Sequence, residues 1–194
     1  IKRLVNELVN PQLSWRELLP QQIQSVIRSD YSFTTPSRKG VESGFYLPGM
    51  ERDQTIDVAV AMDTSGSMSD EMARDILSEV KGCMDQYNDF RIHLFCFDTE
   101  VHNPQVFTEH NMDEFMEYEP GGGGGTDFEC CWNYFKEEGI VPKKFIMFTD
   151  GYPWDSWGDE SYCDTLFIVH GGGYGGQVPE APFGITVPYE RDDK

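Results

Sequence analysis

The chain has 194 residues, with 34 acidic against 15 basic side chains and a formal net charge of -19. That length suits one domain with a real hydrophobic core and a small appendage. The charge repels phosphate backbones, so we expect no nucleic-acid binding; it favours metal cations and basic partners, although a solubilising acidic surface would explain much of the excess equally well.

The cysteines and apolar runs predict a reduced protein that contacts no membrane. The five cysteines form no C-x-x-C pair, and no apolar run approaches the roughly 20 residues that span a bilayer. No signal peptide is visible, so we expect a cytoplasmic protein. The chain starts at Ile1 rather than Met, which indicates that it begins inside a longer protein.

The first 53 residues read as a helical appendage followed by an extended connector. Ser14 is a predicted N-cap, with Glu17 three residues on, and the helix should run to about Arg28 with a kink or a split at Pro20. The polar segment 30–53 predicts a connector that lies over the domain surface. We therefore expect an appendage over 1–53 and the main domain over 54–190.

The main domain alternates predicted strands and helices. Ile56–Met62 is almost continuously apolar, as in a strand buried on both faces, and the apolar stripe from Met72 to Tyr87 predicts a helix. Arg91–Phe97 and Val101–Phe107 are two strands with a connection too short for a parallel crossover. The further expected elements are helices at 111–118 and 127–138 and strands at 144–149, 163–169 and 183–187.

This alternation predicts an α/β fold with a doubly wound, mostly parallel sheet and one antiparallel edge strand. In such sheets ligands bind at the carboxyl ends of the strands. Asp63 and Asp150 each follow a predicted strand, and Gly66 permits a tight turn that aims Ser65 and Ser67 toward Asp63. Oxygen ligands of this kind suit Mg²⁺, Mn²⁺ or Ca²⁺ rather than zinc.

The segment D-T-S-G-S-M-S, residues 63–69, resembles the D-x-S-x-S motif of von Willebrand factor A (VWA) domains, which defines their metal-ion-dependent adhesion site. Thr126, after five glycines, and Asp150, in F-T-D-G, match the threonine and the aspartate that the family takes from two further loops. The resemblance implies a Rossmann-like VWA fold in which Ser65, Ser67 and Thr126 contact the metal directly. Asp63 and Asp150 would act through bound waters or the serines, and a partner's Asp or Glu would complete the site.

Segments that flank this motif are similar to those of bacterial and phage VWA-like proteins described as predicted metallopeptidases. These segments are W-R at 15–16, D-Y-S at 30–32, P-S-R at 36–38, Y-L-P at 46–48, G-G-G-T-D-F at 123–128 and P-F-G at 182–184. That likeness implies a C-terminal domain of a larger protein that works with a MoxR-type AAA+ ATPase. The peptidase motif H-E-x-x-H is absent from this chain, so we expect no catalysis by the chain itself. The alternative is the C-terminal part of a metallopeptidase whose catalytic region lies upstream.

Other interpretations of these residues are weaker. An aspartic peptidase needs a second D-T-G-like loop, and a haloacid-dehalogenase phosphatase needs D-x-D where this chain has Ser65. A purely structural turn at 63–67 remains a third possibility. Asp127 is expected to cap the next helix, and the lone histidines are assigned no role. Trp154 and Trp157 could either anchor a partner or form a small local core.

Overall fold

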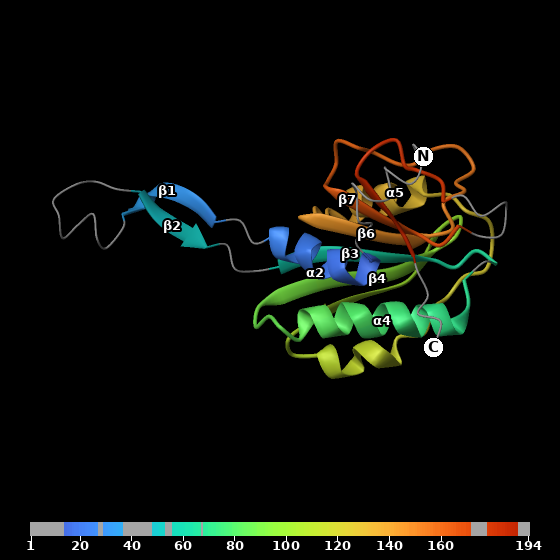
Figure 1. Ribbon diagram of the computed structural model, residues 1–194, viewed down its shortest axis with the longest axis horizontal. Coiled ribbons are helices and arrows are strands. Elements are labelled where there is room, and N and C mark those ends of the chain that lie inside the picture. Colours follow the sequence, from blue (N-terminus) through green and yellow to red (C-terminus); the bar gives the residue numbers. More distant parts are fainter. Residues whose placement is uncertain are drawn as a thin grey trace, which may run out of the picture.

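The computed structural model describes residues 14–26, 29–36, 48–52, 56–66, 68–171 and 178–189. Its centre is a six-stranded sheet in the order β5-β4-β3-β6-β7-β8 (Figure 1). The strands are β3 (Ile56–Asp63), β4 (Phe90–Phe97), β5 (Val101–Thr108), β6 (Lys144–Thr149), β7 (Thr165–Val169) and β8 (Ile185–Pro188). All neighbours are parallel except β4 and β5, so the predicted mostly parallel sheet with one antiparallel edge strand is confirmed.

The order of the strands reverses beside β3. The chain passes from β3 to β4 on one side and later returns to place β6 on the other. The register pairs Asp63 with Phe97 of β4 and Met62 with Phe148 of β6, so the three strands end at the same edge. This edge is the topological switch point, where doubly wound sheets bind their ligands.

Helices cover both faces of the sheet, and each face has its own core. On one face α2 (Trp15–Ser25), α4 (Asp70–Met84) and the 3-10 helix η1 (Met112–Glu117) pack against the sheet; on the other lies α5 (Glu129–Glu138). Alternate residues of β3 supply the two cores, with Val60 facing α4 and Ala61 facing α5. A strand buried on both faces explains its continuous apolar run.

The N-terminal region differs from the prediction in two respects. Helix α2 continues through Pro20 and ends at Ser25, because the buried side chains Trp15, Leu19 and Ile23 hold its whole length on the sheet. The expected connector contains two strands, β1 (Ser29–Pro36) and β2 (Pro48–Arg52), which pair antiparallel and satisfy each other's backbone groups. The prediction of an extended connector over 30–53 did not include this strand pair.

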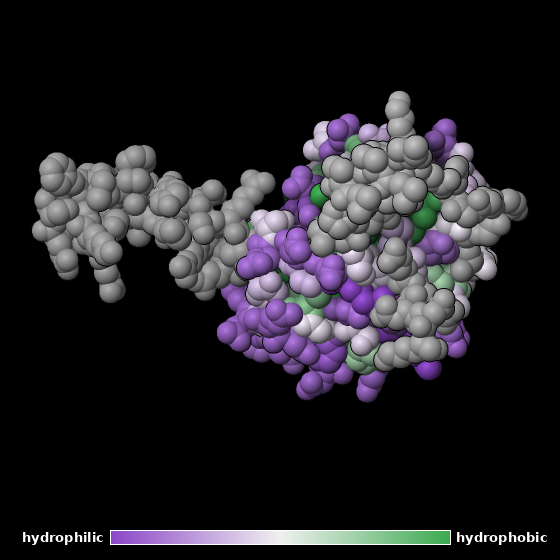
Figure 2. Space-filling view, viewed as in Figure 1, coloured by the Kyte–Doolittle hydropathy of each residue, from purple (hydrophilic) through white to green (hydrophobic). Residues whose placement is uncertain are grey.

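The described surface is mostly hydrophilic on the face shown in Figure 2, with only small apolar spots. Within the described ranges, none of the helices has the length and apolar character needed to cross a membrane. All five cysteines are free thiols, and burial raises the pKa of Cys83 and of Cys163 to about 11, which keeps both protonated at neutral pH.

Candidate metal site

Asp63 is the last residue of β3, and its side chain is fully buried. Its Oδ1 accepts a hydrogen bond from the backbone N–H of Ser65 at 3.0 Å, and its Oδ2 accepts one from the Thr149 hydroxyl at 2.7 Å. Burial raises the pKa of this carboxyl, and the two hydrogen-bond donors act in the opposite direction. The carboxylate is therefore held in a fixed orientation at the carboxyl end of the sheet.

Asp150 follows β6 and brings a second negative charge to the same edge, where it further raises the pKa of Asp63. The Asp150 Oδ1 accepts a hydrogen bond from the Tyr152 amide at 3.0 Å. Within the described residues, no Lys, Arg or His forms an ion pair with Asp63. Nearby His170 does not supply a positive charge at neutral pH, because burial lowers its pKa more than Asp150 raises it.

Ser65 is 7% exposed and lies in the turn after β3, where its amide is fixed by Asp63. The turn then leads into α4: the Ser65 carbonyl accepts from the Met68 amide at 3.1 Å, and the Ser69 hydroxyl accepts from the Met72 amide as the N-cap. Ser67, the other predicted serine ligand, lies outside the described residues.

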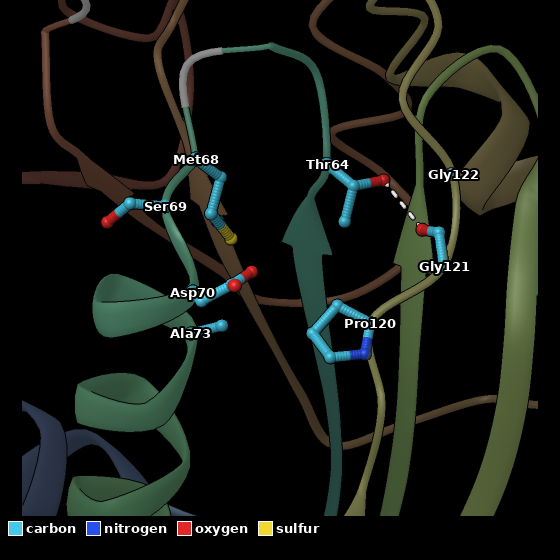
Figure 3. A pocket seen from close by; sticks show the side chains of 8 residues that line it. All are labelled: Thr64, Met68, Ser69, Asp70, Ala73, Pro120, Gly121 and Gly122. Carbon is cyan, nitrogen blue, oxygen red and sulfur yellow. Dashed lines mark hydrogen bonds between the residues drawn. The ribbon is translucent and has the colours of Figure 1, made fainter.

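Thr126 ends the glycine-rich loop, is 7% exposed, and is tied to the loop after β6. Its carbonyl accepts a hydrogen bond from the Trp154 amide at 3.0 Å. The start of the glycine loop is tied to the turn after β3, since the Thr64 hydroxyl donates to the Gly121 carbonyl at 2.8 Å (Figure 3). The three loops that carry the predicted ligands are thus linked to one another by hydrogen bonds.

A third carboxylate, Asp98, anchors the glycine loop from the end of β4. Its Oδ2 accepts from the amides of Gly123 at 3.1 Å and Gly124 at 2.9 Å, and its Oδ1 accepts from the Glu100 amide and lies 2.9 Å from His102 Nε2. Burial raises the pKa of Asp98, but the hydrogen bonds, led by the one from His102, outweigh it and hold that pKa well below its usual range.

The approach of the loop to Asp98 depends on glycine. A Cβ at Gly124 would lie only 2.9 Å from Asp98 Oδ2, closer than non-bonded atoms tolerate. In addition, the Asp127 amide donates to the Asp98 carbonyl at 2.7 Å, so the backbone on both sides of Thr126 is held. The glycine run therefore lets the loop pack closely against the buried Asp98 carboxylate.

The chemistry of these groups fits a hard divalent cation. Two carboxylates with an unfavourable mutual interaction stand beside hydroxyl side chains, which are oxygen ligands of the type that Mg²⁺ prefers. Across the described part of the chain, no three His, Cys, Asp or Glu side chains come together as a metal cluster. A site here would accordingly depend on Ser and Thr oxygens, unlike a zinc centre built from His and Cys.

The structure separates the two tryptophans that the sequence left undecided. Trp157 packs against Phe128 and Phe167, at ring-centroid distances of 5.4 and 5.3 Å, and lies partly buried against the core. Trp154 is 73% exposed. The Asp127 side chain accepts from the Glu129 amide at 3.0 Å, at the first residue of α5, but the N-cap position itself is Phe128, which makes no side-chain capping bond.

Sequence reasoning did not single out Thr149 or Asp98. Thr149 directly precedes Asp150 and orients Asp63 across the two neighbouring strands. Asp98 follows the apolar strand β4 just as Asp150 follows β6, and Asp63 is the last residue of the apolar strand β3. The pattern of an acidic residue at the end of an apolar strand therefore occurs three times in the sequence, and it could have identified Asp98 as well.

A family model described as "VWA-like domain (DUF2201)" matches residues 58–188, and the chain belongs to this family. A second model, described as "Putative metallopeptidase domain", matches residues 1–51. The resemblance to VWA-like proteins that the sequence motifs indicated is therefore confirmed at the level of the family.

One curated relative is an uncharacterised protein of Thermotoga maritima, 27% identical over 145 residues, which are 75% of this chain. The chain spans only 35% of the length of that relative.

Similar solved structures include BatB from Bacteroides thetaiotaomicron, with a TM-score of 0.47, 16% identity and coverage of 69% of this chain and 89% of the other. Another is the ArnB paralog VWA2 from Sulfolobus acidocaldarius, with a TM-score of 0.46, 18% identity and coverage of 58% and 34%.

Proposed function

We propose that this chain is a Mg²⁺-dependent protein-interaction domain that binds a carboxylate of a partner protein. The observation that carries the proposal is the position of Asp63, buried at the end of β3 next to Asp150 and hydrogen-bonded to Ser65 and Thr149. A cation offsets the repulsion between the two carboxylates, and Mn²⁺ or Ca²⁺ could replace Mg²⁺ because the ligands are oxygens.

In this proposal Ser65, Ser67 and Thr126 hold the metal, while Asp63 and Asp150 orient the ligands. A bound divalent cation supplies an electrophilic position that accepts an Asp or Glu side chain of the partner. The residues of the chain do the remaining work: Asp63 fixes the Ser65 amide, and the Trp154 amide fixes the Thr126 carbonyl. Both interactions set the loops before a partner arrives, which reduces the ordering cost of binding.

A metal titration with matched variants tests this proposal. Mg²⁺ should raise the unfolding temperature of the wild type, since a ligand that binds only the native state adds RT ln(1 + [L]/Kd), about 2.7 kcal/mol at one hundred times Kd. Ser65→Ala and Thr126→Ala should lose this response, whereas Ser78→Ala, an exposed serine in the middle of α4, should keep it. Equal responses of all four proteins, or none from the wild type at millimolar Mg²⁺, would refute the proposal.

The partner that we propose is a MoxR-type AAA+ ATPase, on the basis of the resemblance to VWA-like proteins associated with such ATPases. Co-purification of the two proteins in the presence of Mg²⁺, and its loss in EDTA or with Ser65→Ala, would support this pairing. Retention of the ATPase by Ser65→Ala would show that any contact does not use the metal.

A second candidate function is suggested by the model matched to residues 1–51. In this alternative the chain is the C-terminal part of a metallopeptidase, and the catalytic H-E-x-x-H motif lies upstream, since it does not occur in the 194 residues. The length of the Thermotoga maritima relative leaves room for such a region. Translation of the reading frame before Ile1 decides the point, because a frame without that motif removes the peptidase.

A further inference from the structure

The loops around the proposed metal site carry charge of one sign. Segments 63–70, 98–101, 119–129 and 150–156 together contain nine Asp and Glu residues and no Lys or Arg. Arg91 and Lys144 stand at the opposite end of the sheet, near the starts of β4 and β6. The field at the proposed metal site therefore attracts positively charged groups and repels an approaching carboxylate that comes alone.

Trp154 presents a large aromatic face on this acidic surface. Its amide is bonded to the Thr126 carbonyl, and its ring lies so close to Gly125 that a side chain at that position would overlap it. It is nevertheless 73% exposed, whereas Trp157, three residues on, is partly buried and packs against the core. An exposed tryptophan fixed beside a binding loop is a favourable contact for a partner, and in an acidic setting its face suits a cation.

A hollow of about 170 Å³ lies at the other end of the glycine loop, between that loop and the start of α4. Met68, Ala73 and Pro120 give it apolar contacts, Ser69 adds a hydroxyl, and Asp70 contributes a carboxylate, so most of its lining is polar (Figure 3). Thr64 closes one side through its hydrogen bond to Gly121. A polar lining with one carboxylate and a few apolar side chains matches a long basic side chain, whose charged head and methylene stem contact both kinds of surface.

We propose that the partner segment carries Lys or Arg residues on both sides of the carboxylate that reaches the metal. One basic side chain stacks on Trp154, and the other enters the hollow and pairs with Asp70. This inference rests on the proposed function and specifies the partner that the site selects. Charge complementarity is its basis: basic neighbours offset the repulsion that the nine acidic residues exert on an incoming Glu or Asp.

Three short peptides test the inference in the presence of saturating Mg²⁺: acetyl-Arg-Gly-Glu-Gly-Arg-amide, its analogue with Ser in place of both Arg, and its analogue with Gln in place of Glu. Calorimetry should show that the Arg–Glu peptide binds roughly tenfold more tightly than the Ser–Glu peptide at low salt, with a difference that shrinks as salt screens the charges. The Gln analogue should bind least, because it lacks the carboxylate.

Variants locate the two basic contacts. Trp154→Ala and Asp70→Asn should each reduce the preference for the Arg–Glu peptide severalfold, while Trp154→Phe keeps most of it. Glu71→Gln is the matched control for Asp70→Asn, since it removes the same charge from the same turn of α4 but does not line the hollow. Unchanged preference in Trp154→Ala and Asp70→Asn, or equal loss in Glu71→Gln, would overturn the assigned contacts.

The outcomes separate this inference from the proposed function. If Mg²⁺ binds and the Ser–Glu peptide binds as tightly as the Arg–Glu peptide, carboxylate binding stands and the basic partner is refuted. If Mg²⁺ binds but the Gln analogue matches the Glu peptide, or no peptide binds, the partner carboxylate is refuted as well. Failure of Mg²⁺ to bind the wild type, measured without peptide, overturns both.

Discussion

Replacing Asp98 with Asn should destabilise the protein although the two side chains have nearly the same shape. Four backbone amides, which can only donate hydrogen bonds, surround the Asp98 carboxylate. The amides of Gly123 and Gly124 donate to Oδ2, and the amides of Thr99 and Glu100 donate to Oδ1. An Asn side chain must point its NH₂ group at one of these two pairs. Whichever way it turns, two backbone amides lose their acceptor.

The size of the effect follows from those two lost bonds. A hydrogen bond lost at a charged, largely buried acceptor costs about 1–3 kcal/mol, and the exposed glycine amides favour the lower end, so we expect about 2 kcal/mol in total. For a protein of this size that corresponds to a fall of about 4–8 °C in the unfolding temperature. The same change should weaken Mg²⁺ binding, because the glycine loop that presents Thr126 loses its anchor.

Differential scanning calorimetry of Asp98→Asn, with and without Mg²⁺, measures both effects. Glu100→Gln is the control, because it removes one charge from the same turn while the exposed side chain leaves the loop contacts in place. If Asp98→Asn unfolds within about 1 °C of the wild type, the anchor contributes little and the reasoning is refuted. If stability falls but Mg²⁺ affinity does not, the loop keeps its arrangement without Asp98.

Three further changes have defined outcomes. The folded pKa of Asp98 is depressed, so its contribution to stability is complete above the unfolded pKa of about 3.9 and is lost as the pH falls toward the folded pKa. The difference in unfolding temperature between wild type and Asp98→Asn should therefore narrow below about pH 4. A difference that stays constant with pH would contradict this prediction. Thr149→Val should lower the free energy of unfolding by about 1–3 kcal/mol, since buried Asp63 loses a hydrogen-bond donor and the Gly151 amide loses its acceptor. An unchanged midpoint in chemical denaturation would argue against these two hydrogen bonds. Trp15→Ala should lower the free energy of unfolding by about 3–5 kcal/mol, because the fully buried indole packs on Phe148 and Tyr189. A loss under about 1 kcal/mol would mean that α2 contributes little to the packing of the domain.

The sequence was most informative where one rule governed a whole element. The apolar run of β3 and the stripe of α4 predicted those elements well, because burial dictates both patterns. The kink or split predicted at Pro20 was wrong, since the tertiary contacts of Trp15 and Ile23 outweigh the local preference of proline. Pairing of β1 with β2 was missed because a polar strand carries no apolar alternation to reveal it.

For the site, the sequence predicted which loops carry Asp63, Thr126 and Asp150, because the topology brings the ends of neighbouring strands together. It could not reveal how the loops are joined. The bond from Thr64 to the Gly121 carbonyl spans 57 residues, and the bond from the Trp154 amide to Thr126 involves backbone atoms that every residue possesses. Such contacts leave no compositional trace, and only the three-dimensional arrangement shows them.

The position of α2 has a practical consequence for work with pieces of this chain. Arg16 pairs with Asp75 and Glu79 of α4 at 2.6 and 3.0 Å, and Gln22 accepts a hydrogen bond from the buried Lys144 at the start of β6. A fragment cloned from residue 54 or 58 would leave the Lys144 ammonium group without that acceptor and uncover the apolar face beneath Trp15. Expression of the VWA-like domain should therefore begin before Ser14, so that poor solubility of a shorter piece is not mistaken for a property of the domain.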